Sequence, residues 1–419
     1  MDTDVCVAGG GPAGLVLALL LARRDIRVTV LEKHADFLRD FRGDTVHPST
    51  LDVLDELGLG DRVRELPHRR VAGLQVTFAD GTYQMVDFSR LEVAHPYLTF
   101  LPQWDFLELI AREASTHPPF TLLRSHEVVD LVREDGEVRG VVARGPEGPV
   151  EVRARLTVAA DGRHSTVREK LGLTPLEFGA PMDVLWFRVS RRPGDGEGLD
   201  MYVGAGRLLL AIDRGEYWQI AYLIPKGDHD RVVAAGLDAF RESVARLFPP
   251  LVDRVEEIGD WEDVKVLTVQ LDRLRRWHVP GALLIGDAAH AMSPVGGVGI
   301  NLAVQDAVAT ARLLAGPLLA RQLDDGALAR VQARRAFPTA GTQLMQRFMQ
   351  RALLGRILSA DRPVTAPLPV KLLARVPALQ KLPARLVGVG LRPEHVGPRA
   401  PSSSWLARRS VVRGARRRH

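Results

Sequence analysis

The clearest chemical signal in the sequence is one aspartate placed directly after an apolar strand. The stretch "LLIGDAAHAMSPVGGVGINLAVQDA" (283–307) stops being apolar at Gly286 and Asp287, continues through Pro294 and a glycine-rich loop, and then takes up a helical pattern. A carboxylate at the carboxyl end of a strand lies where open α/β sheets bind their ligands. The stretch therefore predicts a site in which Asp287 binds a ligand that is not protein.

The glycines that follow Asp287 suit a flat ligand. Gly296, Gly297 and Gly299 allow the backbone to lie against a planar ring because no Cβ stands in the way. A helix expected from about Asn301 would direct its N-terminal N–H groups at the same place, where they favour negative charge. The loop is therefore expected to border a planar ligand.

A second ligand signal opens the chain, in "DVCVAGGGPAGLVLALLLARRDIRVTVLEK". Gly9, Gly11 and Gly14 form a G-x-G-x-x-G pattern between a strand and a helix, and Glu32 ends the next strand. In this arrangement the glycines make a tight turn, let backbone N–H groups approach a pyrophosphate, and pack the helix on the strand, while the acid accepts hydrogen bonds from ribose hydroxyls. A glycine turn that only packs a helix on a sheet does not explain the acid. The pattern predicts a dinucleotide, either NAD or FAD.

The third signal is "LTVAADGRHSTVR" (156–168), in which Asp161 and Gly162 follow an apolar strand and precede a basic, hydroxyl-rich helix start. In this order and spacing, the three segments resemble the flavin-dependent aromatic hydroxylases, the single-component FAD monooxygenases typified by para-hydroxybenzoate hydroxylase, over about residues 1–340. His164 and Arg168 are candidates to contact the phosphates of a nicotinamide cofactor, or they are solvated residues at a helix start.

The resemblance implies where FAD binds. The N-terminal glycines and Glu32 would hold the ADP half, Arg42 and Gln103 would contact the phosphates and the ribityl chain, and Asp287 would bind the ribityl hydroxyls. The residues assigned to FAD are Gly9, Gly11, Pro12, Ala13, Gly14, Glu32, Lys33, Arg42, Gln103, Val128, Asp161, Gly162, Gly286, Asp287, Pro294, Gly299, Ile300 and Asn301. The loop that faces the isoalloxazine ring comprises Pro294, Gly296, Gly297 and Gly299.

The resemblance also implies a reaction. NADPH or NADH would bind transiently and reduce FAD, and a flavin hydroperoxide formed with O2 would transfer one oxygen atom to a small organic substrate of aromatic or polyketide type. The chain has one G-x-G-x-x-G pattern, which agrees with a transient reductant, and its twelve histidines show no metal-ligand spacing. This chemistry requires no catalytic triad, and no catalytic side chain is assigned.

Other reactions remain open. Baeyer–Villiger oxidation, epoxidation and reduction of a prenyl chain are alternatives, as is a non-catalytic FAD-fold protein that binds a partner. Halogenation is disfavoured because "IAYLIP" (220–225) has Ile220 and Tyr222 where flavin-dependent halogenases carry tryptophans.

The elements that must position these residues indicate an α/β fold. We predict a Rossmann-like FAD-binding domain from residues 1–72, 100–175 and 278–326, interleaved with an antiparallel β-sheet substrate domain from 73–99 and 176–277. A helical region would follow at 327–400, and a basic tail at 401–419. The candidates for the substrate pocket are Trp186, Met201, Tyr202, Trp218 and Tyr222, of which about half are expected to face away because side chains alternate along a strand. His47 would approach the flavin or the substrate, or be a structural histidine.

The charge is distributed unevenly along the chain. Residues 362–419 hold eleven arginines and two lysines against one acid, Glu394, so that residues 1–361 carry a net −7 within the total of +5. An acidic body does not suit a nucleic-acid substrate, and the basic end is either a solvated tail or a segment that binds nucleic acid or anionic lipid. The single cysteine, Cys6, and the absence of a 20-residue apolar run predict a cytoplasmic protein without a membrane span. The oligomeric state is left open.

Overall fold

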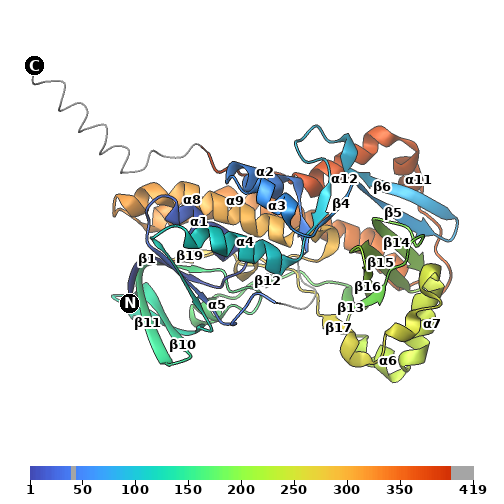
Figure 1. The fold of residues 1–419 in the computed structure, drawn as a ribbon, viewed down its shortest axis with the longest axis horizontal. Helices are drawn as coiled ribbons and strands as arrows, with labels where there is room; N and C mark the ends of the chain where they lie inside the picture. The colour runs from blue at the N-terminus through green and yellow to red at the C-terminus, as the bar shows by residue number, and fades with distance from the viewer. Residues whose placement is uncertain (39–43, 398–419) are drawn as a thin grey trace, which may run out of the picture.

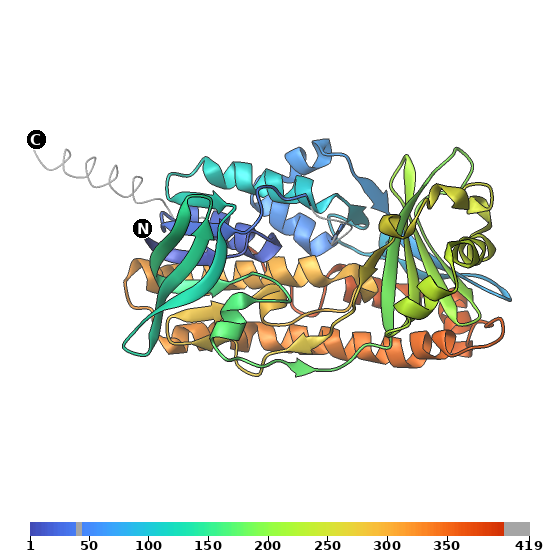
Figure 2. The ribbon, with the colours of Figure 1, turned by 90° about the horizontal axis from the view of Figure 1, so that it is seen from below.

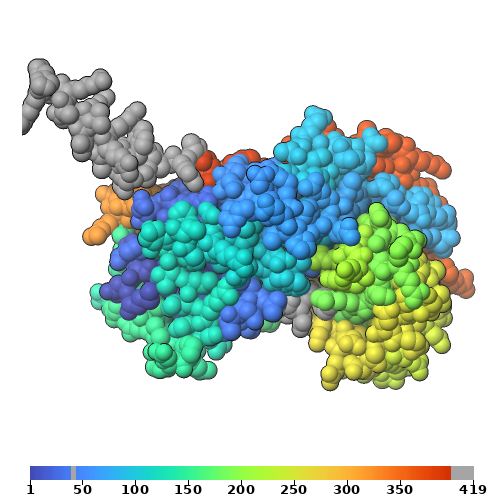
Figure 3. Space-filling view, in the orientation of Figure 1, coloured from blue at the N-terminus to red at the C-terminus, as the bar shows by residue number. Residues whose placement is uncertain are grey.

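The protein, described by a computed structural model over residues 1–38 and 44–397, is elongated and built around two sheets. Figure 1 shows one sheet beside the N-terminus and the other at the opposite end. The space-filling view in Figure 3 shows the same two lobes, one blue and teal and the other green and yellow. Arg42, which is predicted to contact FAD, lies outside the described residues.

The first sheet has eight strands in the order β19-β20-β11-β1-β2-β8, and β10 and β9 extend it from β11. Its strands are β1 (Asp2–Ala8), β2 (Val28–Glu32), β8 (Phe120–Arg124), β9 (Glu127–Glu134), β10 (Glu137–Gly145), β11 (Gly148–Ala159), β19 (His278–Val279) and β20 (Ala282–Leu284). The strands β20, β11, β1, β2 and β8 pair in parallel, so their carboxyl ends lie at one edge of the sheet.

The two faces of this sheet follow from the alternation of side chains along β1. Val5 and Val7 pack in a core with α1 (Pro12–Ala22), α4 (Gln103–Ser115) and α8 (Gly299–Leu319), whereas Cys6 and Ala8 pack in a second core with β9 and β10. Helix α8 is buried on all sides from Ile300 to Ala311, as expected for a helix that packs against both α1 and the next helix, α9 (Asp325–Met349).

The second sheet has seven strands in the order β17-β13-β16-β15-β14-β5-β6. Its strands are β5 (Gly73–Phe78), β6 (Gly81–Asp87), β13 (Met182–Ser190), β14 (Leu199–Gly204), β15 (Arg207–Asp213), β16 (Tyr217–Pro225) and β17 (Lys265–Leu267). All neighbours are antiparallel except β14 and β5, which pair in parallel. A turn at Ala79 and Asp80 joins β5 to β6, and α7 (Leu237–Leu247) covers one face of the sheet.

Other short elements complete the two lobes. They are α2 (Pro48–Glu56), α3 (Gly60–Glu65), α5 (Thr166–Lys170), α6 (His229–Ala234), the three-stranded sheet of β3 (Thr45–Val46), β7 (Leu98–Phe100) and β4 (Arg69–Val71), and the pair β12 (Leu176–Glu177) and β18 (Asp272–Arg273). Helix α9 contacts β19 in the first lobe, continues through the π-helical turn η7 (Gln350–Leu354), and reaches β15 through α10 (Gly355–Leu358) (Figure 2). Helices α11 (Leu368–Arg375) and α12 (Pro377–Gly388) follow and pack on β6.

The structure confirms the predicted fold class, a Rossmann-like α/β part interleaved with a mainly antiparallel sheet and followed by helices. The domain boundaries given above stay a prediction. The run Val295–Leu319 is long and apolar enough to cross a membrane, but 72% of its most apolar window is buried inside the protein, as in a core helix.

Candidate functional site

The three sequence signals meet at one edge of the eight-stranded sheet. Because β1, β2, β11 and β20 run in parallel, the residues that follow their carboxyl ends lie side by side. These residues are Gly9 after β1, Glu32 at the end of β2, Asp161 after β11, and Gly286 and Asp287 after β20. We refer to this edge as the strand-end groove.

The glycines of the groove are of two kinds. A Cβ on Gly9 would overlap the carbonyl group of Ala160, and one on Gly14 would overlap the carbonyl oxygen of Gly9, so the protein's own packing requires both. Gly11 and Gly299 differ, because neither has a positive φ and no protein atom lies within 4 Å of a Cβ built there. The protein itself does not explain these two glycines, whereas a ligand lying against the backbone does.

Gly11 and Gly299 stand at the starts of α1 and α8, which lie on either side of Gly286. A Cβ on Gly286 would be 3.3 Å from the Cβ of Ala13 and 3.5 Å from that of Ala303. Neither helix has a side-chain cap or an acidic residue in its first turn. Their free N–H groups and dipoles therefore favour an anion in the groove.

Glu32 lies at the end of β2 and is buried. Its Oε2 accepts a hydrogen bond from the N–H of Gly10 at 3.0 Å, and its Oε1 accepts one from the N–H of His34 at 3.0 Å. Each carboxylate oxygen can accept a second hydrogen bond. Glu32 thus fixes the glycine loop, and a carboxylate at this strand end is the type of group that accepts hydrogen bonds from ribose hydroxyls.

The carboxylate of Asp161 hydrogen-bonds to neighbouring residues of the protein rather than facing the open side of the groove. Its Oδ1 accepts from the hydroxyl of Ser165 at 2.5 Å and its Oδ2 from the N–H of Val167 at 3.2 Å, so that it caps α5. Burial raises the pKa of Asp161 even though these donors lower it. Its neighbour Gly162 has φ +83° with open space around its Cα, so this motif presents backbone to a ligand.

Asp287 belongs to the 3₁₀ turn η5 (Gly286–Ala288), and its side chain is 30% exposed to the groove. Its Oδ2 lies 3.1 Å from Nε of Arg163, which joins this motif to the one after β11. Arg168 donates to the carbonyl oxygens of Ala288 and Arg163, so its guanidinium holds the two loops together. His164 is exposed.

A buried charge network behind Asp287 was not assigned from the sequence. Asp306 of α8 accepts the N–H of Gly286 at 3.0 Å and lies 2.6 Å from Nε2 of His290 and 2.9 Å from Nε of Arg335. Burial raises the pKa of Asp306, but His290 and Arg335 outweigh it and leave the pKa below its ordinary value. Asp306, in "QDA" at 305–307, is the only acidic residue in the mostly apolar stretch 299–319, and this pattern could have pointed to it.

The loop predicted to face the flavin forms the turn η6 (Val295–Gly297) after Pro294. Gly296 and Gly297 have φ +81° and +64°, a region that favours glycine. The Nε2 of His47 lies 2.9 Å from the carbonyl oxygen of Gly297, so Nε2 carries the proton. Burial lowers the pKa of His47, which keeps it neutral and fits the structural role.

The remaining predicted residues take several positions. The Oδ1 of Asn301 accepts from Ser49 at 2.9 Å and Thr50 at 2.8 Å, which ties α8 to α2. Gln103 is the first residue of α4, and its N–H hydrogen-bonds Asp44. Pro12 and Ala13 form the first turn of α1, Ile300 is buried in α8, Val128 is buried in β9, and Lys33 is exposed.

The seven-stranded sheet turns one face toward this loop. Trp186, Met201 and Leu210 pack in the same cluster as Val295 of η6, and we refer to this side as the inner face. Trp218 and Tyr222 are buried on the opposite side among residues of α7, and Tyr202 packs there too. These three side chains therefore face away from the loop, in line with the expectation that about half of the candidates would do so, because their positions along the strands place them on the other face.

The inner face carries polar atoms without partners. Nε1 of Trp186, Oε1 of Gln219 and Nη1 of Arg214 are buried and make no hydrogen bond. In the pairing of β13 with β16, Trp186 is opposite Ala221. Gln219 is two residues before Ala221 on β16, so its side chain is on the same face of the sheet as that of Trp186. An unpaired buried polar atom costs free energy, which a ligand can recover.

Arg214 also forms an ion pair at this end of the sheet. Its Nη2 lies 3.0 Å from Oδ2 of Asp44, and both side chains are at most 10% exposed. Burial raises the pKa of Asp44, although Arg214, Gln103 and Gln219 each lower it. Asp44, Arg214 and Gln219 were not predicted from the sequence as site residues. Of the three, only Gln219 could have been found there, because it is a polar residue within the apolar stretch "YWQIAYLIP".

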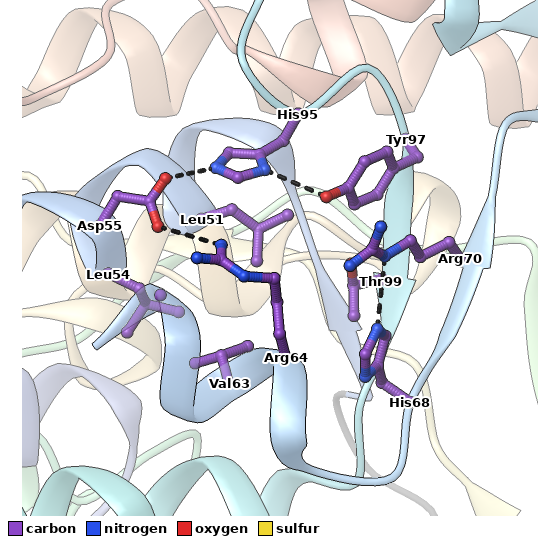
Figure 4. A pocket seen from close by; sticks show the side chains of 11 residues that line it. Leu51, Leu54, Asp55, Val63, Arg64, His68, Arg70, His95, Tyr97 and Thr99 are labelled. Carbon is purple, nitrogen blue, oxygen red and sulfur yellow. Dashed lines mark hydrogen bonds and ion pairs between the residues drawn. The ribbon is translucent and has the colours of Figure 1, made fainter. Parts of the chain in front are cut away.

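A separate pocket lies among α2, α3 and the three-stranded sheet (Figure 4). His95 lies 2.7 Å from Oδ2 of Asp55 through Nε2 and 3.1 Å from the hydroxyl of Tyr97 through Nδ1, and Arg64 lies 3.7 Å from Asp55. These polar side chains pair with one another, so we assign the pocket no ligand. Within residues 1–38 and 44–397, no three His, Cys, Asp or Glu side chains are arranged to hold a metal ion.

Comparison with known proteins adds to this geometry. Residues 2–344 match the family model described as an FAD binding domain. The chain is 35% identical over 388 residues to the 6-methylpretetramide 4-monooxygenase of Streptomyces rimosus, and the alignment covers 92% of each protein. The solved structure of an anhydrotetracycline hydroxylase from Streptomyces rimosus is 26% identical, with a TM-score of 0.72 over 95% of this chain and 78% of that one. A probable FAD-dependent monooxygenase from Pseudomonas aeruginosa, 22% identical, shares the fold, with a TM-score of 0.74 over 86% and 98% of the two chains.

Proposed function

The chain belongs to the FAD binding domain family and is an FAD-dependent monooxygenase, and from this premise we propose that it hydroxylates a polycyclic aromatic polyketide with NADH or NADPH as reductant. The observation that carries the cofactor site is the pair Gly11 and Gly299, two glycines at uncapped helix starts whose open space no protein atom explains. The relatives whose names contain 6-methylpretetramide and anhydrotetracycline support the substrate class.

The residues of the strand-end groove fit FAD. In the proposal the pyrophosphate lies against Gly11 at the start of α1, Glu32 accepts from a ribose hydroxyl, and Asp287 accepts from the ribityl chain. The loop at 294–299 borders the ring. When bound, FAD would carry electrons from the nicotinamide to O2, one oxygen atom of which enters the substrate.

The protein's own contribution is to orient the substrate and to stabilise charge. The start of α8 directs free N–H groups toward the loop, where they would stabilise negative charge. On the inner face, Trp186 and Leu210 would contact an apolar ring system. Nη1 of Arg214 would donate to an oxygen of the substrate, favouring an ionised phenol or enol, and Oε1 of Gln219 would accept a hydrogen bond from a substrate hydroxyl.

The reductant is proposed to bind outside the groove. His164 is exposed beside the Asp161 motif and is the residue we propose for the nicotinamide cofactor's phosphates. Arg168 is less suited because its guanidinium already donates to two carbonyl oxygens. The cytoplasm, which supplies NADH and NADPH, is the compartment we propose for the enzyme.

The proposal is tested by following the flavin and the product in turn. Purified protein with added FAD should show an oxidised-flavin spectrum that NADH or NADPH bleaches without air and that O2 restores. A polycyclic polyketide phenol should then gain one oxygen atom as a new hydroxyl, identified by mass and NMR. Asp287→Ala should lower FAD retention while the protein stays folded.

Three results would contradict the proposal. Protein that holds no flavin would remove the cofactor assignment, and Asp287→Ala with full flavin content would remove the role of Asp287. A lactone, an epoxide or a reduced prenyl chain as the product would replace hydroxylation with one of the alternative reactions.

A further inference from the structure

The helices α11 and α12 expose an apolar surface that the monooxygenase chemistry does not use. Their inner side is buried through Val370, Gln380, Ala384 and Gly388. Their outer side exposes Leu368 by 82%, Leu372 by 58% and Leu382 by 69%, together with Val376 and Leu379. We refer to these five outward residues as the α11–α12 patch.

The patch follows the geometry of the two helices. Leu368, Leu372 and Val376 are four residues apart and so lie along one side of α11, while Leu379 and Leu382 lie on one side of α12, opposite its buried stripe. The connection through Val376 and Pro377 is exposed, which joins the two rows. Both helices lie at the upper edge of the molecule in Figure 1. Exposed apolar side chains gathered in this way mark an interaction surface.

The charge around the patch is positive. Arg375 and Arg385 are exposed beside the leucines, whereas Lys371 and Lys381 are held by Asp80 and Glu92 at 2.6 Å each. The one acid after Asp361, Glu394, is buried and pairs with Arg312, Arg334 and Arg335. In sequence, residues 398–419 add seven arginines and no acid. The described residues after 361 therefore expose no carboxylate.

We propose that the α11–α12 patch binds the surface of an anionic lipid bilayer. Helices with leucines on one side and arginines at the flanks lie in the boundary between headgroups and acyl chains, and basic residues attract anionic headgroups. The acidic remainder of the chain, at −7, is repelled by the same surface, which orients the protein with this edge toward the membrane.

Other occupants fit the charge less well. A second copy docked through the same patch would place two basic surfaces against each other. A nucleic acid would meet the arginines but would leave the five apolar side chains without a partner. Lipid satisfies both features at once.

The test is co-sedimentation of the full chain, loaded with FAD, with vesicles of phosphatidylcholine alone or mixed with phosphatidylglycerol. We expect binding to the mixed vesicles that weakens with salt, and little binding to phosphatidylcholine alone. The double variant Leu372→Asp/Leu382→Asp should bind at least tenfold more weakly. Leu344→Asp is the matched control, since Leu344 is 65% exposed on α9 outside the patch, and its binding should be unchanged.

Several outcomes would overturn the proposal. The first two are equal binding to both kinds of vesicle and no binding to either. The third is unchanged vesicle binding by the double variant, which would mean that charge alone causes the binding. If the protein forms a dimer that the double variant dissociates, the patch binds a second copy of the chain. If the protein binds RNA and the double variant binds it equally well, the partner is a nucleic acid. Flavin content and thermal unfolding verify that the variants fold, and Leu372→Gln/Leu382→Gln replaces the double variant if the aspartates unfold it.

Discussion

The strand-end groove and the inner face of the seven-stranded sheet present different chemical groups. The groove presents backbone N–H groups, glycines and helix starts, and its carboxylates Glu32, Asp161 and Asp306 already accept hydrogen bonds from the protein. The inner face presents side chains, and three of them, Trp186, Gln219 and Arg214, have buried polar atoms without a partner. The first surface is preorganised, whereas the unpaired polar atoms of the second would gain hydrogen bonds from a ligand.

This difference separates the two parts of the enzyme's task. A cofactor that is the same in every turnover can be held by a scaffold whose geometry is set by strand order and glycine. A substrate is distinguished by the few polar atoms that it must satisfy, because a site with unpaired groups rejects a molecule that cannot pair them. The variants below change one surface and leave the other as the control.

The largest effect is expected for Asp306, which supports the groove from behind. Asp306→Ala leaves the buried Arg335 and His290 with one partner fewer, so we expect a loss of about 3–5 kcal/mol in the free energy of unfolding. FAD retention should fall with it, since Gly286 loses its acceptor. Chemical denaturation and flavin content measure both. A variant with wild-type stability would show that the network does not support the groove.

The same aspartate predicts a pH dependence. The pKa of Asp306 is below its ordinary value in the folded protein, so its contribution is present above the unfolded pKa of 3.8 and is lost as the pH falls through the folded pKa. Asp306→Asn should flatten this acid limb of the unfolding free energy. An acid limb as steep as that of the wild type would assign the dependence to other carboxylates.

Gly299→Ala should separate cofactor binding from folding. No protein atom opposes the new methyl group, and alanine favours a helix over glycine by up to about 1 kcal/mol, so the FAD-free protein should melt at the same temperature or higher. If FAD lies against Gly299, its affinity should drop about tenfold or more, as for an overpacked contact. Flavin titration and thermal melting are the measurements, and undiminished FAD affinity would place the ring elsewhere.

Trp186→Phe should act on the inner face alone. It removes one unpaired donor and keeps the aromatic contact, and loss of one neutral hydrogen bond to substrate costs about 0.5–1.5 kcal/mol, or about 2- to 10-fold in kcat/KM. Trp218→Phe, on the α7 side of the same sheet, should lower stability and leave the KM unchanged. The reverse pattern would mean that the substrate binds on the side of α7. Flavin content should stay at the wild-type level in both.

The smallest effect is expected for Asp80, at the outer edge of the seven-stranded sheet. Hydrogen bonds from Lys371 and from the N–H of Ala366 lower the pKa of Asp80 to about 2, so its contribution is lost as the pH falls from 3.8 to about 2. Asp80→Asn should remove this small dependence and loosen α11 without changing FAD affinity. Unfolding curves recorded through that pH range measure it, and an unchanged acid limb would show that the pair adds nothing to stability.

The sequence allowed the groove to be predicted far better than the inner face. Gly9, Gly11, Gly14 and Glu32 lie within one short unit whose local pattern of strand, turn, helix and strand fixes their geometry. Trp186 and Trp218 cannot be separated in this way, because which face a strand residue takes depends on the register with its neighbours. Asp44 and Arg214 are 170 residues apart, and no local pattern relates them.

The α/β class, the order of the ligand-binding segments and the dinucleotide nature of the site could be predicted from the sequence alone, because contiguous residues encode turns and helix starts. The three-dimensional arrangement was needed to show that Asp306 supports Gly286, that Arg168 joins two loops, and that Trp186 is the tryptophan that packs with Val295. Those features depend on contacts between distant segments. Such contacts are set by the packing of whole elements, which no short stretch of sequence specifies.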